Sequence, residues 1–79
     1  MDTVQERVRR AVAAFAKAER FGDEEDILKA GIIDSLDTIQ LIFRLEQDCG
    51  ITIGQEDLVP EHWRSVSAIT ALVLRKKGR

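Results

Sequence analysis

Ser35 is the side chain whose surroundings most suggest chemistry, because it lies between Asp34 and Leu36 where a loop gives way to an amphipathic segment. A catalytic serine needs a base within hydrogen-bond reach and donors that stabilise an oxyanion. The single histidine, His62, lies in a turn-like segment, and we interpret it as a surface residue. A hydroxyl presented without a base is better suited to being modified by another protein than to catalysis.

Other reactive residue types are too sparse to form a second kind of site. The one cysteine, Cys49, and the one histidine are far apart in the sequence and match no zinc-binding pattern. Cys49 occupies an apolar position near a predicted helix end, so we expect a buried, unreactive thiol. The chain also lacks a glycine-rich phosphate loop. The sequence therefore predicts no catalytic residues and no metal ligands.

Three long helices and one short helix are predicted to position these side chains. The first runs from about Thr3 to Arg20, because Thr3 and Glu6 have the spacing of a capping box and apolar residues then recur at helical spacing. Gly22 is expected to end this helix. Residues 22–34 then form a long connection whose apolar members should anchor it to the core: Ile27, Leu28, Ile32 and Ile33.

The second helix is predicted from about Ser35 to Cys49, with Asp34 and Gly50 as its caps. Its apolar side chains spread over more than half of the circumference. Such a helix is central to a bundle or keeps part of its surface for a partner. The polar residues fill the remaining arc: Asp37, Gln40, Arg44, Gln47 and Asp48.

The rest of the chain is predicted to complete a bundle. Residues 51–53 are mostly β-branched but have no partner strand, so we expect an extended connector. Pro60 suits the first turn of a short helix, in which Trp63 is expected to anchor the core. Ser65 can cap a last helix that reaches about Lys76. The predicted fold is an all-α, small four-helix bundle with three main helices and one short helix.

Length and composition describe one small domain that covers residues 1–79. The net charge of −2 is too small to indicate nucleic-acid binding. The single cysteine fits a reducing compartment, so we expect a cytoplasmic location, and no run approaches the roughly 20 apolar residues that span a bilayer. Met1 and the charged C-terminus favour an independent protein over a domain excised from a larger synthase. The basic residues that close the chain are expected to be solvated: Arg75, Lys76, Lys77 and Arg79.

The run around Ser35 reads Gly31-Ile32-Ile33-Asp34-Ser35-Leu36, and the helix after it continues to Leu45-Glu46. This run resembles the phosphopantetheine attachment region of acyl and peptidyl carrier proteins, which has a glycine, two apolar residues, Asp-Ser-Leu and an amphipathic helix that ends in Leu-Glu. The triplet alone is unspecific, but its place at the start of the second of four helices is specific. The resemblance covers nearly the whole chain.

The resemblance implies that Ser35 carries a covalent 4′-phosphopantetheine group. A phosphopantetheinyl transferase would add it from coenzyme A with a Mg²⁺ ion bound largely by the transferase, and Asp34 would help to present Ser35. Further implied partners are an acyl- or aminoacyl-activating ligase and a downstream synthase or transferase. The carrier itself is expected to be a monomer. Leu36, Ile39 and Phe43 would form the apolar patch that partner enzymes contact. The full set of implied contact residues is Leu36, Asp37, Ile39, Gln40, Phe43 and Arg44.

The chain also departs from the fatty-acid type of carrier, whose second helix is strongly acidic. Here Gln40 and Arg44 lie in the polar arc, so partners that recognise a continuous acidic stripe should bind less well. Gln40 and the turn at residues 61–65 look more like D-alanyl and other aminoacyl carriers. The bulk of Phe43 is expected to narrow any groove for a long acyl chain. We therefore expect a small or amino-acid cargo.

The favoured interpretation is a carrier protein, not an enzyme by itself, that holds an acyl or aminoacyl group as a thioester and presents it to partner enzymes. Two alternatives stay open. In one, the chain is a small helical interaction module without a prosthetic group, in which Leu36 and Phe43, which border the polar arc and should be accessible, dock a partner helix. In the other, Ser35 and His62 form a minimal serine hydrolase.

Overall fold

The computed structural model describes residues 3–78. Within this range the chain forms only helices and loops, without strands: α1 (Val4–Phe15), α2 (Ser35–Cys49), the short 3-10 helix η1 (Gln55–Asp57), α3 (Pro60–Trp63) and α4 (Val66–Lys77). The predicted all-α fold with three long helices and one short α-helix is confirmed, and η1 is an addition. Met1 and Arg79, on which sequence-based expectations also rest, lie outside the described residues.

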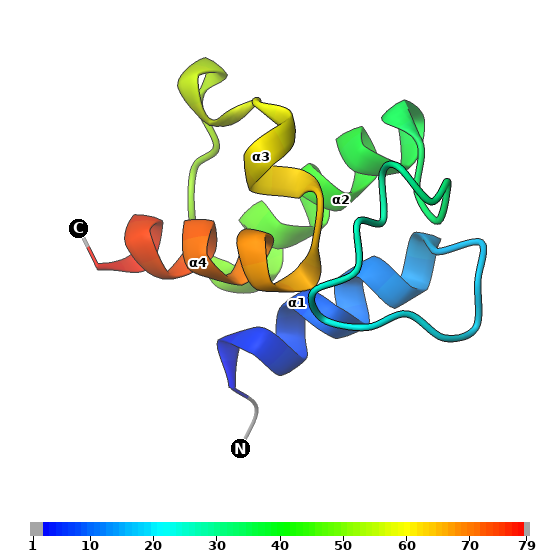
Figure 1. Ribbon diagram of the computed structural model, residues 1–79. Coiled ribbons are helices and arrows are strands. Elements are labelled where there is room, and N and C mark those ends of the chain that lie inside the picture. Colours follow the sequence, from blue (N-terminus) through cyan, green and yellow to red (C-terminus); the bar gives the residue numbers. More distant parts are fainter. Residues whose placement is uncertain (1–2, 79) are drawn as a thin grey trace.

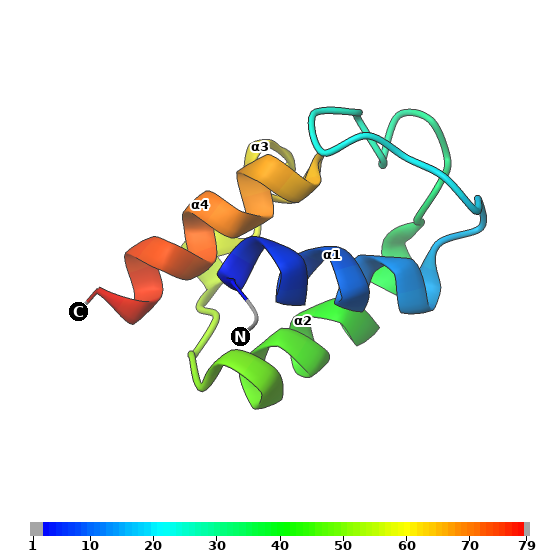
Figure 2. The same cartoon turned by 90° about the horizontal axis from the view of Figure 1, so that it is seen from below.

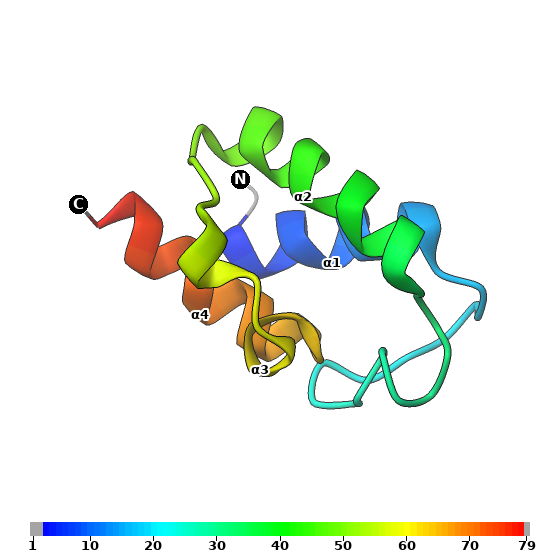
Figure 3. The same cartoon turned by 90° about the horizontal axis from the view of Figure 1, so that it is seen from above.

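The long helices are arranged around α1 (Figures 1 and 2). α1 packs against both α2 and α4, and α3 packs on α4. The connection from α1 to α2 loops out at one end of the bundle beside the start of α2, whereas the end of α4 lies at the opposite end (Figure 3). Among the described helices, none is both long and apolar enough to cross a membrane.

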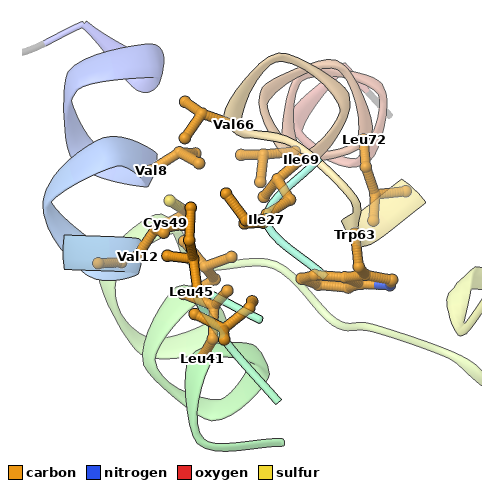
Figure 4. Packing of buried hydrophobic residues seen from close by; sticks show 14 of the residues in the cluster. Val8, Val12, Ile27, Leu41, Leu45, Cys49, Trp63, Val66, Ile69 and Leu72 are labelled. Carbon is orange, nitrogen blue, oxygen red and sulfur yellow. The ribbon is translucent and has the colours of Figure 1, made fainter. Parts of the chain in front are cut away.

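The core contains side chains from the long helices, from α3 and from the connection between α1 and α2. Trp63 is buried, and its indole N–H donates to the carbonyl oxygen of Asp57 at 2.9 Å, so the predicted core anchor is confirmed. Cys49 is a buried free thiol, as predicted, and burial raises the pKa of this thiol. Figure 4 labels ten of the converging side chains: Val8, Val12, Ile27, Leu41, Leu45, Cys49, Trp63, Val66, Ile69 and Leu72.

Local capping interactions explain why the helices begin where the sequence predicts. The hydroxyl of Thr3 accepts a hydrogen bond from the Glu6 amide at 3.1 Å, and the Glu6 carboxylate accepts one from the Thr3 amide at 2.9 Å. At the start of α4 the cap is one-sided, because the hydroxyl of Ser65 accepts a hydrogen bond from the Ala68 amide at 3.0 Å without a reciprocal bond. Gly31 and Gly50 have φ angles of 74° and 66°, a region that favours glycine. Gly50 ends α2 as expected.

α1 is shorter than predicted, because it ends at Phe15 rather than near Arg20, and Gly22 is not its cap. At Ala16 the backbone is extended, with φ −69° and ψ 141°, and residues 17–19 form a bend. Leaving the helix here allows Phe21 to enter the core, where its side chain is buried. Residues 16–20 share the helical propensity of the residues before them, but tertiary packing overrides this propensity.

The connection that follows α1 is anchored by its main chain and its side chains. The amide of Lys17 donates to the carbonyl oxygen of Ile32 at 2.8 Å, and the amide of Ile27 donates to that of Arg64 at 2.7 Å. The predicted anchoring is confirmed: Leu28 is half-buried and the other three apolar residues are buried, namely Ile27, Ile32 and Ile33.

The region around η1 and α3 corrects two smaller expectations. His62 is half-buried rather than a surface residue: its Nδ1 lies 3.1 Å from the carbonyl oxygen of Asp57 and its Nε2 lies 3.3 Å from Nη2 of Arg75. Lys76 is not simply solvated, since its ammonium group lies 2.5 Å from the buried carboxylate of Asp57. Lys76, and then the amide of Gly54, hold the pKa of Asp57 below its usual range.

Candidate functional site at the start of α2

Ser35 is the first residue of α2, and its side chain is exposed at the end of the bundle where the connection loops out. Within residues 3–78 its hydroxyl has no hydrogen-bond partner. The hydroxyl is therefore accessible to a molecule that approaches from solvent.

Asp34 and Asp37 form a reciprocal capping box around Ser35. Oδ1 of Asp34 accepts from the Asp37 amide at 2.9 Å, and Oδ2 of Asp37 accepts from the Asp34 amide at 3.1 Å. The hydroxyl of Thr38 donates to the carbonyl oxygen of Asp34 at 2.8 Å. These bonds hold the first turn of α2, so the backbone that carries Ser35 has a defined position.

Lys17 completes this arrangement from the end of α1. Its ammonium group donates to Oδ2 of Asp34 at 3.0 Å and to Oδ2 of Asp37 at 2.5 Å. The Asp37 amide, and then Lys17, lower the pKa of Asp34. The bonds to Asp37, and then to Asp34, raise the pKa of Lys17. Asp34 and Lys17 are therefore both charged at neutral pH.

An open groove of about 370 Å³ lies beside Ser35, between α2 and the segment that leads into α3. Its walls are mostly apolar, so it suits an extended, partly apolar chain that starts at Ser35. Phe43 does not line this groove, so the expectation that its bulk narrows the groove is wrong. The lining residues are Leu28, Ser35, Thr38, Ile39, Ile42, Leu58, Val59, Pro60 and Trp63.

The apolar residues expected to meet partners are exposed on α2. Leu36, Ile39 and Phe43 are 64%, 51% and 63% exposed, which confirms the accessibility predicted for Leu36 and Phe43. An exposed apolar surface of this kind on a small protein is typical of a contact surface. We name these three residues the α2 patch.

The polar residues expected to meet partners differ from one another in their surroundings. Gln40 is exposed. Arg44 pairs with Asp48 one turn further along α2, with 3.2 Å between Nε and Oδ2. Asp37 is half-buried and bonded to Lys17. Two of the three charged or polar side chains therefore already have an ionic partner within the chain.

A serine hydrolase finds no support in the hydrogen bonds of residues 3–78, because none joins Ser35 to His62. Both nitrogens of the His62 ring instead contact groups of η1 and α4. The same part of the chain contains no group of three or more His, Cys, Asp or Glu side chains that could hold a metal ion.

Comparison with known proteins shows the family of the chain. Residues 6–73, most of the chain, match the protein family described as "Phosphopantetheine attachment site". The chain belongs to this family. Members of the phosphopantetheine attachment family carry a covalently attached 4′-phosphopantetheine group and are not themselves catalytic.

Individual relatives agree with this family. The chain is 35% identical over 51 residues to the D-alanyl carrier protein of Streptococcus suis (strain 98HAH33). It is 33% identical over 51 residues to that of Streptococcus suis (strain 05ZYH33). In both cases the aligned part spans 65% of this chain and 65% of the relative. These similarities confirm the resemblance to carrier proteins drawn from the sequence.

The start of α2 fits the prosthetic group of the phosphopantetheine attachment family. A serine-linked phosphate requires an accessible hydroxyl, and Ser35 has one. The N-terminus of a long helix favours the negative charge of a phosphate. The apolar groove beside Ser35 has room for a flexible arm.

Three residues of this region were not predicted from the sequence. Lys17 falls inside the predicted first helix, and nothing in the local sequence marks it as a partner of Asp34. Leu58 and Val59 are exposed and line the groove. The signal that could have found them is the position of two apolar residues directly before Pro60, at the start of a helix too short to bury both.

Proposed function

We propose that this chain is a carrier protein that holds an acyl or aminoacyl group as a thioester on a 4′-phosphopantetheine arm attached to Ser35. The observation that carries the proposal is the exposed Ser35 hydroxyl at the first residue of α2, beside an apolar groove and without a hydrogen-bond partner in residues 3–78. When attached, the arm supplies the thiol that forms the thioester. Tethering raises the effective concentration of the cargo at each partner's active site.

The residues at the start of α2 have separate parts in this function. During modification the Ser35 hydroxyl loses its proton to a base of the transferase, its oxygen bonds to phosphorus, and coenzyme A loses 3′,5′-adenosine diphosphate. The N-terminus of α2 favours the negative charge that the phosphate keeps. Asp34 holds Ser35 in place through the capping box and helps to present it to the transferase.

The proposed cargo is a small amino acid of the D-alanyl kind. The relatives named above are D-alanyl carrier proteins. The groove is open to solvent, so a long acyl chain would keep apolar surface in water at a cost of about 0.8 kcal/mol per exposed CH₂ group. A short polar cargo has no such cost.

The proposed partners are a phosphopantetheinyl transferase, an activating ligase and a downstream synthase or transferase. They would meet a monomer whose carrier domain covers residues 1–79, through the α2 patch and its polar neighbours. We also propose a cytoplasmic location, which the single free cysteine supports. The proposed contact residues are Leu36, Asp37, Ile39, Gln40, Phe43 and Arg44.

The direct test is the intact mass of the protein after incubation with coenzyme A, Mg²⁺ and a broad-specificity phosphopantetheinyl transferase. Wild type should gain the mass of one phosphopantetheinyl group. Ser35→Ala should gain none, whereas Ser67→Ala, which removes a serine hydroxyl from α4, should behave as wild type. Failure of the wild type to gain mass with several active transferases would overturn the proposal. The intact mass of protein isolated from its own cell would identify the cargo.

A helical interaction module is the second candidate, because the α2 patch is exposed without any modification of Ser35. In that case a partner should bind the unmodified protein as tightly as the modified one, and Ser35→Thr should be tolerated. The carrier proposal expects transfer of cargo only from the modified protein. Comparing unmodified and modified protein in one loading assay separates the two.

A further inference from the structure

Lys17 is joined to the start of α2 by both its main chain and its side chain. Its amide donates to the carbonyl oxygen of Ile32, two residues before Asp34. Its ammonium group bonds the carboxylates of Asp34 and Asp37, the residues that lie on either side of Ser35 along the chain. Because Lys17 lies two residues after the end of α1, it connects the end of one helix with the beginning of another.

The charges at this place are unusual for a residue that is to receive a phosphate. Asp34 and Asp37 bring two negative charges to the first turn of α2, and Lys17 is the cation bonded to both of them. A phosphodiester on Ser35 would add a further negative charge. Without a cation, three like charges would share one helical turn.

We propose that Lys17 is a positioning residue of the attachment site, which holds Asp34 and Asp37 in place and offsets the negative charge that modification brings to Ser35. This inference rests on Ser35 as the attachment point. It assigns the role to a residue of the α1–α2 connection, outside the run that resembles other carriers.

The distances allow this role without a direct bond to the phosphate. The ammonium nitrogen of Lys17 lies 3.0 Å from the carboxylate of the residue next to Ser35. Consecutive Cα atoms are about 3.8 Å apart, so a phosphate on Ser35 lies well within the Debye length of roughly 30 Å that applies at 0.01 M salt. Two of the three N–H groups of the ammonium have acceptors in the capping box, so the charge of Lys17 is held beside Ser35 by Asp34 and Asp37.

The experiment compares melting temperatures of unmodified and modified protein at low salt, for wild type and three variants. In Lys17→Met, modification should lower the melting temperature by about 2–5 °C more than in wild type, since the added charge is no longer offset. Lys17→Arg keeps the charge and should behave as wild type. Lys77→Met removes one positive charge at the far end of α4, with its bond to the Cys49 carbonyl, and should also leave the difference unchanged. The additional decrease in melting temperature that modification causes in Lys17→Met should vanish at about 1 M salt.

A purely structural clamp predicts another result, in which Lys17→Met lowers the melting temperatures of unmodified and modified protein equally. That result would overturn the proposal that Lys17 offsets the charge of the modified Ser35 and would leave the carrier function intact. In wild type itself, the Lys17 Cε–Hε NMR signal should shift on modification while that of Lys77 does not, and an unchanged Lys17 signal would also overturn it. If the intact mass shows no modification of wild type, the carrier proposal fails, and this role fails with it.

Discussion

At the scale of single residues, Asp34 has two tasks at the start of α2. One oxygen of its carboxylate caps the helix through the Asp37 amide, and the other pairs with Lys17. Both bonds favour the charged form and lower the pKa of Asp34. The pKa of Lys17 is raised above 10.5, so the stability that this lysine contributes is complete below that pH and is lost as the pH rises through its folded-state pKa.

The corresponding prediction is that Asp34→Asn reduces the loss of stability in acid. Because the pKa of Asp34 lies below 3.8 in the folded protein, its contribution is complete above that pH and is lost as the pH falls through the folded-state pKa. The variant lacks the charged carboxylate, so it should be less stable than wild type at neutral pH. Because its side-chain amide does not titrate, its free energy of unfolding should decrease less in acid. Urea unfolding between about pH 2 and pH 7 measures this. Asp48→Asn, at the other end of α2, is the control; equal acid profiles of wild type and Asp34→Asn would contradict the prediction.

At the scale of elements, α2 has three surfaces with different tasks. One packs in the core, one lines the groove beside Ser35, and one exposes the α2 patch. The helix begins at the Asp34 capping box and ends at Gly50. Both ends are set by local chemistry, and the patch and Ser35 lie on one continuous helix.

Gly50→Ala tests how the end of α2 is set. At a φ of 66° an added Cβ costs about 1–2 kcal/mol, which should lower the melting temperature by several degrees. No heavy atom lies within 4 Å of that Cβ, so the cost is conformational rather than a collision. Gly22→Ala is the matched control, because its φ is not positive and its nearest neighbour would be at 3.9 Å. Equal melting temperatures of the two variants would contradict the prediction.

Phe43→Ser tests the α2 patch. Because Phe43 is exposed, the free energy of unfolding should change by less than about 0.5 kcal/mol. Loss of an aromatic contact at an interface costs about 1–2 kcal/mol, so kcat/KM of a partner enzyme should fall about tenfold. Leu74→Ser replaces an exposed apolar residue on α4 and should leave kcat/KM unchanged. An unchanged kcat/KM for Phe43→Ser would remove this residue from the contact surface.

At the scale of the whole molecule, the core is small and shared by every helix. A chain of 79 residues buries only about 60–65% of the surface that its unfolded form exposes, so its stability is at the low end of the range of about 5–15 kcal/mol. The loss of one large core side chain is therefore a large fraction of the total. The long connection adds apolar anchors to this core, among them Phe21, Ile27, Ile32 and Ile33, which explains why it can be long and still ordered.

Leu45→Ala and Leu74→Ala form a matched pair that tests this. Leu45 is 0% exposed and Leu74 is 52% exposed. The core substitution should cost about 2–5 kcal/mol, a large part of the free energy of unfolding, whereas the surface substitution should cost less than about 0.5 kcal/mol. Circular dichroism during urea unfolding measures both. Similar midpoints for the two variants would contradict the assignment of Leu45 to the core.

The sequence by itself determined the helices whose ends are set by local chemistry, and with them the place of Ser35. Asp34, Gly50, Ser65 and Pro60 act on their nearest neighbours in the chain, so their effects could be predicted without the fold. The exposure of Leu36 and Phe43 followed from helical geometry alone.

Only the tertiary structure decided where α1 ends, what surrounds His62, which residues line the groove and what Lys17 contacts. α1 ends at Phe15 because Phe21 packs in the core, a contact that no local propensity encodes. Lys17 meets Asp34 and Asp37 across 17 and 20 positions of the chain. Such contacts depend on the packing of α1 against α2, and the physical reason is that the free energy of burial acts between segments distant in the sequence, whereas capping acts within one turn.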